Sequence, residues 1–405
     1  MRKISSKRML AIMCLFYTGA NMAHPFTPTM FTRLGLPDYM FGVALACMSV
    51  MGFIMGPFWG KASDIYGRIR IMVIGCIGYS VGQLMFCYAS SVVTVIIARL
   101  FSGFFCNATI ICSLAYISDT AQGSERSKIM AYQAALMSSF SAGGYLLGGI
   151  LGDISITLAF YVQSAILLFT GLITGLVLMD ANEKDTGKKI TDIIKTANPF
   201  SVFIKSKDIV TPMMVVLLIS VGTAAFATTC FDNAFNYYIK AEFDFPSTYN
   251  GLIKACVGII GFLANISVCM WLIKHVNARK SMMFLFTVCV SVIVVVLNAH
   301  TIPVFIAVSI CYYIFNSMYL PIQQSLVMSS ADKANSGMIA GLFNSIRSIG
   351  TVFGSLAAGF VYSYGSKLPF VLAAGMFALT LVIVIYNYIQ NNVEYGVAHE
   401  NCVKS

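Results

Sequence analysis

Five ionisable side chains lie inside long apolar stretches of this sequence, namely His24, Arg99, Asp232, Lys254 and Arg347. A charged group in an apolar helix that crosses a membrane is costly unless it faces a polar partner or a water-filled cavity, so each is a candidate for function. Asp232 is the only acidic residue well inside such a stretch. Proton transfer and contact with a charged solute are the chemistry that these groups can supply.

Proton coupling is one role for His24, Asp232 and Arg99. Histidine titrates near neutral pH, and carboxylates inside membranes commonly belong to proton relays. For His24 and Asp232, the alternative is a structural hydrogen bond or ion pair at the outer mouth of the protein. For Arg99, the alternatives are contact with an anion and a hydrogen-bond hub between helices.

Other polar side chains are candidates for lining a substrate cavity. Arg347 lies one turn from Asn344 on the same helix face, where a solute carboxylate or phosphate could contact it. The alternative for Arg347 is that it lines an inner cavity without contact. We expect Lys254 to extend toward the outer membrane interface. The remaining candidates are Asn21, Asn107, Tyr145, Asn233 and Gln323, with association between helices as the alternative for the amides.

A loop rich in glycine and charge follows the second apolar stretch. It reads Gly60-Lys-Ala-Ser-Asp64-Ile-Tyr-Gly67-Arg68-Ile-Arg70. Glycine permits a tight turn, and an acid at a helix end beside guanidinium groups can form a charged latch at the membrane surface. The alternative is an ordinary loop whose basic residues only set the orientation of the chain.

Glycines at helical spacing predict close packing between helices, because small residues let two backbones approach. The glycines concerned are Gly103, Gly144, Gly148, Gly149, Gly350, Gly354 and Gly359.

The composition indicates an integral membrane protein. Of 405 residues, 58% are hydrophobic and 10% are charged, against about 25% charged in a soluble domain. The mean hydropathy of +0.81 agrees. The net charge of +10 comes without a separate basic block, so we expect no nucleic-acid partner. No Cys-x-x-Cys or His-Glu-x-x-His motif occurs, so we expect no metal site.

Twelve apolar stretches are long enough to cross a bilayer, which takes about 20 residues of helix. With the N-terminus inside, twenty basic residues fall in inner segments and three in outer segments. The positive-inside rule therefore predicts a multi-pass protein of the cell membrane with both termini in the cytoplasm. The predicted spans cover about 9–31, 39–60, 70–89, 91–118, 128–152, 156–179, 210–239, 248–273, 281–299, 302–327, 335–362 and 367–390.

The sequence contains an internal repeat. Residues 36–42 match residues 245–251 at an offset of 209, and Arg70 matches Arg279 at the same offset. Two parallel six-helix halves with a site between them characterise a large class of secondary transporters. The predicted organisation is a six-helix half at 1–179, a cytoplasmic linker at 180–209, a second half at 210–391 and a cytoplasmic tail at 392–405.

The loop at 60–70 resembles the signature loop of the major facilitator superfamily, whose pattern is Gly-x-x-x-Asp-(Arg/Lys)-x-Gly-Arg-x-(Arg/Lys). One position departs from the pattern, because Ile65 stands where a basic residue is usual. The matching residues are Gly60, Asp64, Gly67, Arg68 and Arg70.

The resemblance extends along the chain. Residues 99–103, from Arg99 to Gly103, are similar to the core of the family's fourth-span motif, and residues around Asp119 and Arg126 look like the inner end of that span. The resemblance implies that Asp119 completes a latch with Asp64 and Arg68. This latch would gate the change between inward-open and outward-open states.

The stretch at 144–149 is similar to the Gly-Pro-x-x-Gly-Gly pattern of the drug:proton antiporter branch, with Tyr145 in place of the proline. The resemblance implies an all-α membrane protein with twelve transmembrane helices in two six-helix pseudo-repeats. It further implies proton-coupled efflux of amphipathic drugs or small organic compounds by alternating access. A specific exporter or importer of a sugar, an amino-acid derivative or a metal-chelating compound is the alternative.

The partners expected from this interpretation are a small-molecule substrate, protons and the lipid bilayer. The sequence lacks the Gly-x-x-x-x-Gly-Lys-(Ser/Thr) pattern of nucleotide-binding proteins, so we expect that ATP does not drive transport directly. We expect a monomer that is not an enzyme and that needs no cofactor.

Overall fold

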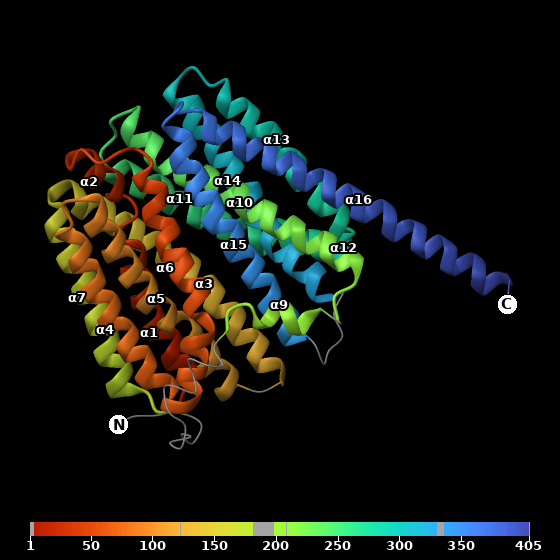
Figure 1. Cartoon of the computed structure of the whole chain (residues 1–405), viewed down its shortest axis with the longest axis horizontal. Coiled ribbons are helices and arrows are strands. Elements are labelled where there is room, and N and C mark those ends of the chain that lie inside the picture. Colours follow the sequence, from red (N-terminus) through yellow and green to blue (C-terminus); the bar gives the residue numbers. More distant parts are fainter. Residues whose placement is uncertain (1–3, 122, 181–197, 208, 330–335, 405) are drawn as a thin grey trace. The chain divides into compact units, whose positions relative to one another are not determined.

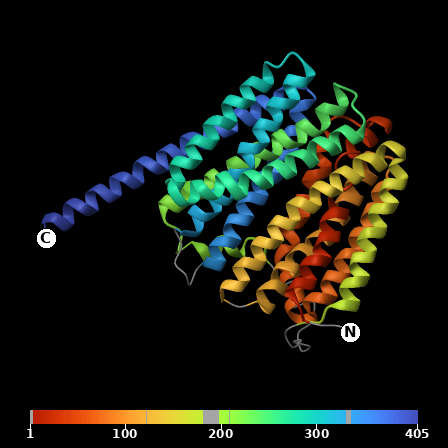
Figure 2. The same ribbon diagram turned by 180° about the vertical axis from the view of Figure 1, so that it is seen from behind.

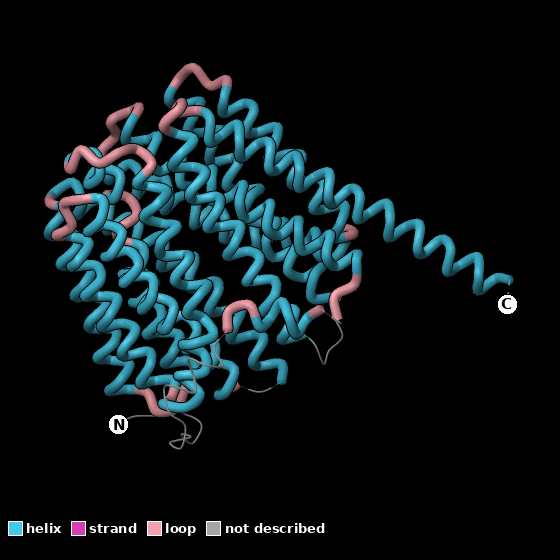
Figure 3. The backbone as a smooth tube through the Cα atoms, in the orientation of Figure 1, coloured by secondary structure: helices cyan, strands magenta, loops and turns pink. Residues whose placement is uncertain are grey.

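The computed structural model describes residues 4–121, 123–180, 198–207, 209–329 and 336–404, and within these residues every regular element is a helix (Figure 3). Ten of the described helices are long and apolar enough to cross a membrane. The predicted all-α membrane architecture is confirmed.

Contacts along the chain divide it into two compact units. Unit 1 comprises Met1–Ser201 and Phe235–Phe262. Its helices, red to yellow in Figure 1 apart from the green end of α10 and α11, are α1 (Ser6–Asn21), α2 (Thr27–Arg33), α3 (Met40–Tyr66), α4 (Arg68–Cys87), α5 (Val92–Thr120), α6 (Gly123–Ile154), α7 (Ile156–Val177), the end of α10 (Pro212–Ala241) and most of α11 (Ser247–Ala264).

Unit 2 comprises Val202–Ala234 and Leu263–Ser405. The long helix at the C-terminus of this unit is drawn in blue in Figures 1 and 2. Its elements are α9 (Ser201–Ser206), the first part of α10, the π-helix η1 (Asn265–Cys269), α12 (Met270–His275), α13 (Ala278–Leu297), α14 (Ile302–Ser329), α15 (Ser336–Tyr362) and α16 (Leu368–Lys404).

The units and the predicted halves have different boundaries, because residues 235–262 group with unit 1. The predicted linker at 180–209 contains α9, and its residues 181–197 and 208 lie outside the described residues. The division into halves, linker and tail therefore stays a prediction.

Serine and asparagine side chains begin several of the helices. Ser91 and Thr94 form a reciprocal capping box at the start of α5. Ser155 accepts from the third amide of α7, and Asn277 accepts from the Arg279 amide in α13. These caps satisfy amides that a helix leaves without a partner in its first turn.

The first predicted span, 9–31, is interrupted. α1 ends at Asn21, turns cover 22–26, and α2 begins at Thr27. Pro25 has no N–H to donate, and a proline disfavours helical geometry in the residue before it, which here is His24. The 16 residues of α1 alone are too few to cross a bilayer.

Polar side chains from neighbouring helices donate to carbonyl groups beside this interruption. Gln163 of α7 donates to the Gly19 carbonyl at 2.9 Å, and the Tyr79 hydroxyl of α4 donates to the Ala20 carbonyl at 3.3 Å. Broken helices persist in membranes only where such partners replace the lost bonds.

The predicted span at 335–362 forms α15 but is not among the ten apolar helices. Asn344 and Arg347 near its middle lower its hydropathy, which gives a physical reason for the difference.

Candidate functional site

Arg68, at the start of α4, joins the ends of three helices. Its Nε donates to Asp119 Oδ2 of α5 at 3.0 Å, and its Nη2 forms an ion pair with Asp64 of α3. Its Nη1 donates to the Gly60 carbonyl at 3.3 Å and to the Ser63 hydroxyl. Arg68 and Asp119 are 17% and 20% exposed. One guanidinium therefore bridges two carboxylates on different helices, and solvent screens its pair with Asp119 less than its pair with Asp64, whose side chain is 57% exposed.

The turn between α3 and α4 requires glycine at one position. Gly67 has a φ of 98°, where a side chain is strained. Gly60 has open space around it, because nothing lies within 4 Å of a Cβ built there. Ile65, which replaces the usual basic residue, is 7% exposed and packs in the hydrophobic core of unit 1.

The other members of the predicted latch take different positions. Arg70 is exposed and contributes no contact to the Arg68 cluster among the described residues. The side chain of Arg126 lies outside the described residues. Asp180, shortly after the end of α7, accepts from the Ile69 amide at 2.8 Å and so caps the first turn of α4.

Arg99 is 4% exposed and makes contacts with neutral groups. Its guanidinium lies 3.6 Å from the centroid of the Phe86 ring, and its two Nη atoms contact Met48 Sδ at 3.3 Å and Thr27 Oγ1 at 3.4 Å. Among the described residues, its Nε has no hydrogen-bond partner and no acid pairs with it. One turn on, a Cβ at Gly103 would lie 2.7 Å from the Met48 carbonyl oxygen, so α5 and α3 touch there.

His24 lies at the interruption of the first span and faces α6. Its ring meets the Tyr145 ring edge to face, with centroids 5.7 Å apart. Asn21, at the end of α1, donates to the Ser141 hydroxyl of α6 at 2.9 Å. Asn107 of α5 donates to a carbonyl of its own helix at 3.0 Å. The structure thus brings His24, Tyr145 and Asn21 together along the contact between the first span and α6.

Glycines of α6 make this contact close. A Cβ at Gly144 would lie 2.3 Å from the Thr18 carbonyl oxygen, and one at Gly148 would lie 2.0 Å from the Met22 carbonyl oxygen. Real Cβ atoms do not approach other atoms so closely, so the two backbones meet at a distance that only glycine permits.

A second face of α6 meets α11. A Cβ at Gly149 would lie 2.7 Å from the Ser247 carbonyl oxygen, and one at Gly251 would lie 2.4 Å from the Tyr145 carbonyl oxygen. These backbone contacts give a physical reason why residues 235–262 group with unit 1.

An acid at the end of α6 binds the start of α11. Asp153 accepts from the backbone amides of Ser247 and Thr248, at 2.7 and 2.8 Å. The Ser247 hydroxyl lies 3.0 Å from the Thr29 hydroxyl of α2. The carboxylate therefore serves as the N-terminal cap of a helix from another part of the chain.

Three more contacts hold residues 235–262 within unit 1. The Tyr237 hydroxyl donates to Asp38 Oδ1 at 2.7 Å, and the Tyr237 ring stacks on Phe41 with centroids 4.6 Å apart. Asn250 donates to the Pro25 carbonyl at 3.3 Å.

Sequence reasoning did not find the contacts of Asp153, Ser247, Asp38 and Tyr237. A serine after Pro246 is a helix-start signal that could have placed α11. Its acidic partner is 94 residues away in the chain, a separation at which local patterns carry no information.

In unit 2, two adjacent polar residues of α10 contact different neighbouring helices. Asp232 accepts from the Tyr313 hydroxyl of α14 at 2.8 Å, and the adjacent Asn233 donates to the Ser355 hydroxyl of α15 at 3.0 Å. His24 belongs to unit 1 and Asp232 to unit 2. Proton coupling by either residue stays a prediction.

The remaining polar candidates of unit 2 differ in exposure. Gln323 is fully buried and donates to the Ser220 hydroxyl at 3.1 Å. Asn344 and Arg347 are exposed, and Asn344 donates to the Ala340 carbonyl of its own helix at 3.1 Å. Arg347 is therefore more accessible to a solute than Gln323.

The glycines of α15 lie against α10. A Cβ at Gly350 would lie 2.3 Å from the Gly222 carbonyl oxygen, and one at Gly354 would lie 2.5 Å from the Phe226 carbonyl oxygen. Gly359 is buried in the same helix. In the α15–α10 contact of unit 2, as in the contact between α6 and the first span, glycines let two helix backbones approach closely.

The expectation that Lys254 extends to the membrane interface is wrong. The side chain is buried at 6% exposure, and its Nζ lies 5.6 Å from the centroid of the Phe235 ring. Attraction between the ammonium group and the face of the aromatic ring stabilises the positive charge at this buried position.

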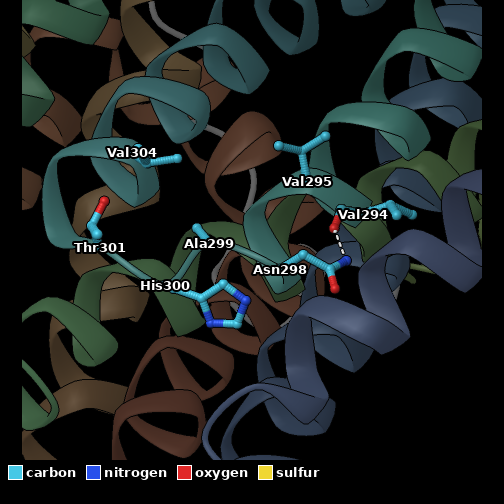
Figure 4. A pocket seen from close by; sticks show the side chains of 7 residues that line it. All are labelled: Val294, Val295, Asn298, Ala299, His300, Thr301 and Val304. Atoms are coloured by element: carbon cyan, nitrogen blue, oxygen red, sulfur yellow. Dashed lines mark hydrogen bonds between the residues drawn. The ribbon is translucent and has the colours of Figure 1, made fainter.

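A surface hollow at the turn between α13 and α14 is separate from these candidates (Figure 4). Asn298 there donates to the Val294 carbonyl of its own helix at 2.8 Å. The hollow shares no residue with the predicted site. The lining residues are Val294, Val295, Asn298, Ala299, His300, Thr301 and Val304.

Comparison with known families gives a match along nearly the whole chain. A model described as Major Facilitator Superfamily matches residues 9–266 and 217–396. Multidrug resistance protein 1 of Bacillus subtilis (strain 168) is 21% identical over 384 residues, which cover 95% of this chain and 96% of that protein. Quinolone resistance protein NorA of Staphylococcus aureus (strain MSSA476) is 22% identical over 373 residues, covering 92% and 93%.

Solved structures share the fold at low sequence identity. The human organic anion transporter MFSD10 (TETRAN) aligns with a TM-score of 0.68 at 16% identity, covering 94% of this chain and 100% of that one. The nucleoside transporter NupG aligns with a TM-score of 0.75 at 11% identity, covering 95% and 98%. A bacterial homolog of the human lysosomal transporter Spinster, inward-facing and occupied, aligns with a TM-score of 0.76 at 10% identity, covering 95% and 96%.

Proposed function

This chain belongs to the major facilitator superfamily, and we propose that it exports amphipathic drugs or small organic compounds in exchange for protons. It is a multi-pass membrane transporter and not an enzyme. The proposal concerns the solute, the direction and the coupling ion. The positive-inside rule predicts that both termini and the Arg68 cluster face the cytoplasm.

The observation that carries the proposal is the similarity to two resistance proteins over more than nine-tenths of the chain. One is named for multidrug resistance and the other for quinolone resistance. The similarity covers nearly all of the predicted spans. It therefore concerns the whole transport path of the two resistance proteins and not one local motif.

The ionisable residues of the spans support proton coupling. Asp232 faces the Tyr313 hydroxyl, and His24 faces the Tyr145 ring at a break in a span. A titratable group at membrane depth that contacts polar or aromatic side chains is a candidate for taking up and releasing a proton. We assign His24 and Asp232 as the first candidates for the coupling proton, and Arg99 as a cation that could attract an anion or a carboxylate.

The Arg68 cluster supports gating on the cytoplasmic side. Its ion pairs hold neighbouring ends of α3, α4 and α5 together. Alternating access needs at least two conformations of comparable stability, and a charged cluster at a helix end can favour one of them.

Transport of one specific metabolite is the second candidate function. The exposed guanidinium of Arg347 beside Asn344 favours it, because such a pair could bind a solute carboxylate or phosphate. A carrier of this kind should lose transport when Arg347 is replaced by glutamine, whereas a drug exporter with a mainly apolar site should keep it.

The test uses the full chain in proteoliposomes with a pH-sensitive dye inside. A panel of cationic dyes, neutral amphipathic compounds, sugars and zwitterionic metabolites is added with and without an imposed proton gradient. We expect amphipathic compounds to move against their gradient and to change the internal pH. Solute movement with no change of internal pH would remove proton antiport, and transport of a single polar metabolite would favour the second candidate.

A further inference from the structure

The carboxylate of Asp153 binds the first turn of α11 with both of its oxygens. Oδ1 accepts from the Ser247 amide at 2.7 Å, and Oδ2 accepts from the Thr248 amide at 2.8 Å. Amides in the first turn of a helix have no partner within the helix, and the positive end of the helix dipole favours a negative charge there. The ionised form of Asp153 is therefore the form that binds α11.

Three further contacts join the same two parts of the chain. Residues 235–262 belong to the predicted second half, yet they group with residues of the predicted first half in unit 1. Thr29 lies 3.0 Å from the Ser247 hydroxyl, Asp38 accepts from the Tyr237 hydroxyl at 2.7 Å, and Pro25 accepts from Asn250 at 3.3 Å. We call these contacts, together with those of Asp153, the outer clasp.

The clasp has the chemistry of a contact that can open and close. All of its hydrogen bonds are made by polar groups that water can also satisfy, and Asp153 is exposed, so that water can reach it. Direct and water-mediated hydrogen bonds differ little in free energy, so such a contact can exchange one for the other. The carboxylate contributes the charge-assisted bonds, which are the stronger ones.

We propose that Asp153 is a positioning residue that holds the outer end of the transporter closed, and that the outer clasp opens when solute leaves to the outside. The proposal rests on the proposed export by alternating access and on the predicted topology, which places the end of α6 outside. Alternating access requires the two halves to separate on one side of the membrane at a time. Separation on the outer side would have to break each contact of the clasp.

Hydrogen exchange at the clasp tests this directly. Exchange is measured by mass spectrometry on the full chain in lipid nanodiscs, at residues 245–252, which contain the bound amides, and at residues 36–42, which contain Asp38. The variants are Asp153→Asn, which keeps the shape without the charge, and Asp153→Glu, which keeps the charge. Asp244→Asn is the matched control, because it removes another exposed acid near the start of α11.

We expect exchange in Asp153→Asn to rise about tenfold in both segments, because the closed state loses its charge-assisted bonds and the clasp opens as a unit. Asp153→Glu should restore most of the protection, and Asp244→Asn should match the native chain. A merely structural cap would give a different pattern, since fraying of the first turn of α11 raises exchange at 245–252 alone. That pattern, or unchanged exchange in both segments, would overturn the proposal.

Transport measurements separate this inference from the proposed function. Proton-driven export combined with the expected exchange pattern supports both. Proton-driven export with exchange that Asp153→Asn does not alter overturns the clasp and leaves antiport standing. The expected exchange pattern in a chain that shows no proton-driven transport overturns antiport and leaves Asp153 as the residue that holds the clasp closed.

Discussion

The Nε of Arg68 on α4 donates to the carboxylate of Asp119 on α5 over 3.0 Å, while the same guanidinium pairs with Asp64 on α3. We expect Asp119→Asn to lower the transport rate about tenfold, because the bridge between α4 and α5 loses its charge. Arg68→Gln should be at least as severe. The double variant Arg68→Gln with Asp119→Asn should lower the transport rate by less than the product of the two single effects, since both substitutions remove the same interaction.

Arg70, which lies in the first turn of α4 as Arg68 does, is the matched control for Arg68. It matches the family pattern but is exposed and takes no part in the Arg68 cluster among the described residues. Arg70→Gln is therefore expected to lower the rate by less than either Arg68→Gln or Asp119→Asn. An equal loss would show that residues 60–70 act through charge in general and not through this cluster.

Gly60, which lies within α3, and Gly67, in the turn that follows this helix, should respond differently to alanine. At Gly67, with its φ of 98°, we expect Gly67→Ala to lower the free energy of unfolding by about 1–3 kcal/mol. At Gly60, where nothing lies within 4 Å of the added Cβ, Gly60→Ala should be neutral or slightly stabilising. Thermal unfolding of the purified protein in detergent measures both. A destabilised Gly60→Ala variant would contradict the open space found beside α3 at this residue.

A similar comparison tests the contact between α6 and the first span. In Gly148→Ala, the new methyl group would lie 2.0 Å from the Met22 carbonyl oxygen, so we expect a loss of about 1–3 kcal/mol from forced displacement of the backbones. Gly143→Ala, five residues earlier in the same helix, meets nothing within 4 Å and serves as the matched control. Equal melting temperatures for the two variants would refute a close contact at Gly148.

Replacing the acid of α10 tests its part in proton coupling. We expect Asp232→Asn to keep solute exchange across the membrane while losing acceleration by a proton gradient, because the amide does not titrate. Tyr313→Phe removes the hydrogen bond of 2.8 Å to Asp232 and should shift the pH profile of transport without abolishing coupling. Proton-driven transport retained in Asp232→Asn would exclude this residue and leave His24 as the candidate in the first span.

The features that the sequence predicts are those with short spacing in the chain. Asp64 and Arg68 are four residues apart, and Gly144 and Gly148 share a helix face by the same spacing, so their contacts can be anticipated from the pattern. The position of Asp119 near Arg68 is implied by the family resemblance and not by spacing.

The features that the sequence does not predict depend on distant partners. Asp153 and Ser247 are 94 residues apart, and nothing local marks their contact. The interface position predicted for Lys254 is wrong because the residues near it in the chain give no hint of the Phe235 ring. The break at Pro25 escapes prediction because the apolar stretch continues through it, and Pro57 and Pro321 lie within continuous helices.

The interruption of the first span also has a consequence for how the chain is made. The Gly19 carbonyl accepts from Gln163, and the Pro25 carbonyl accepts from Asn250, which is 225 residues downstream. Each carbonyl enters the membrane during synthesis well before its donor exists. The first span therefore completes its polar contacts only when α11 has been inserted, and a chain truncated after α7 would leave the second of these carbonyls without its donor.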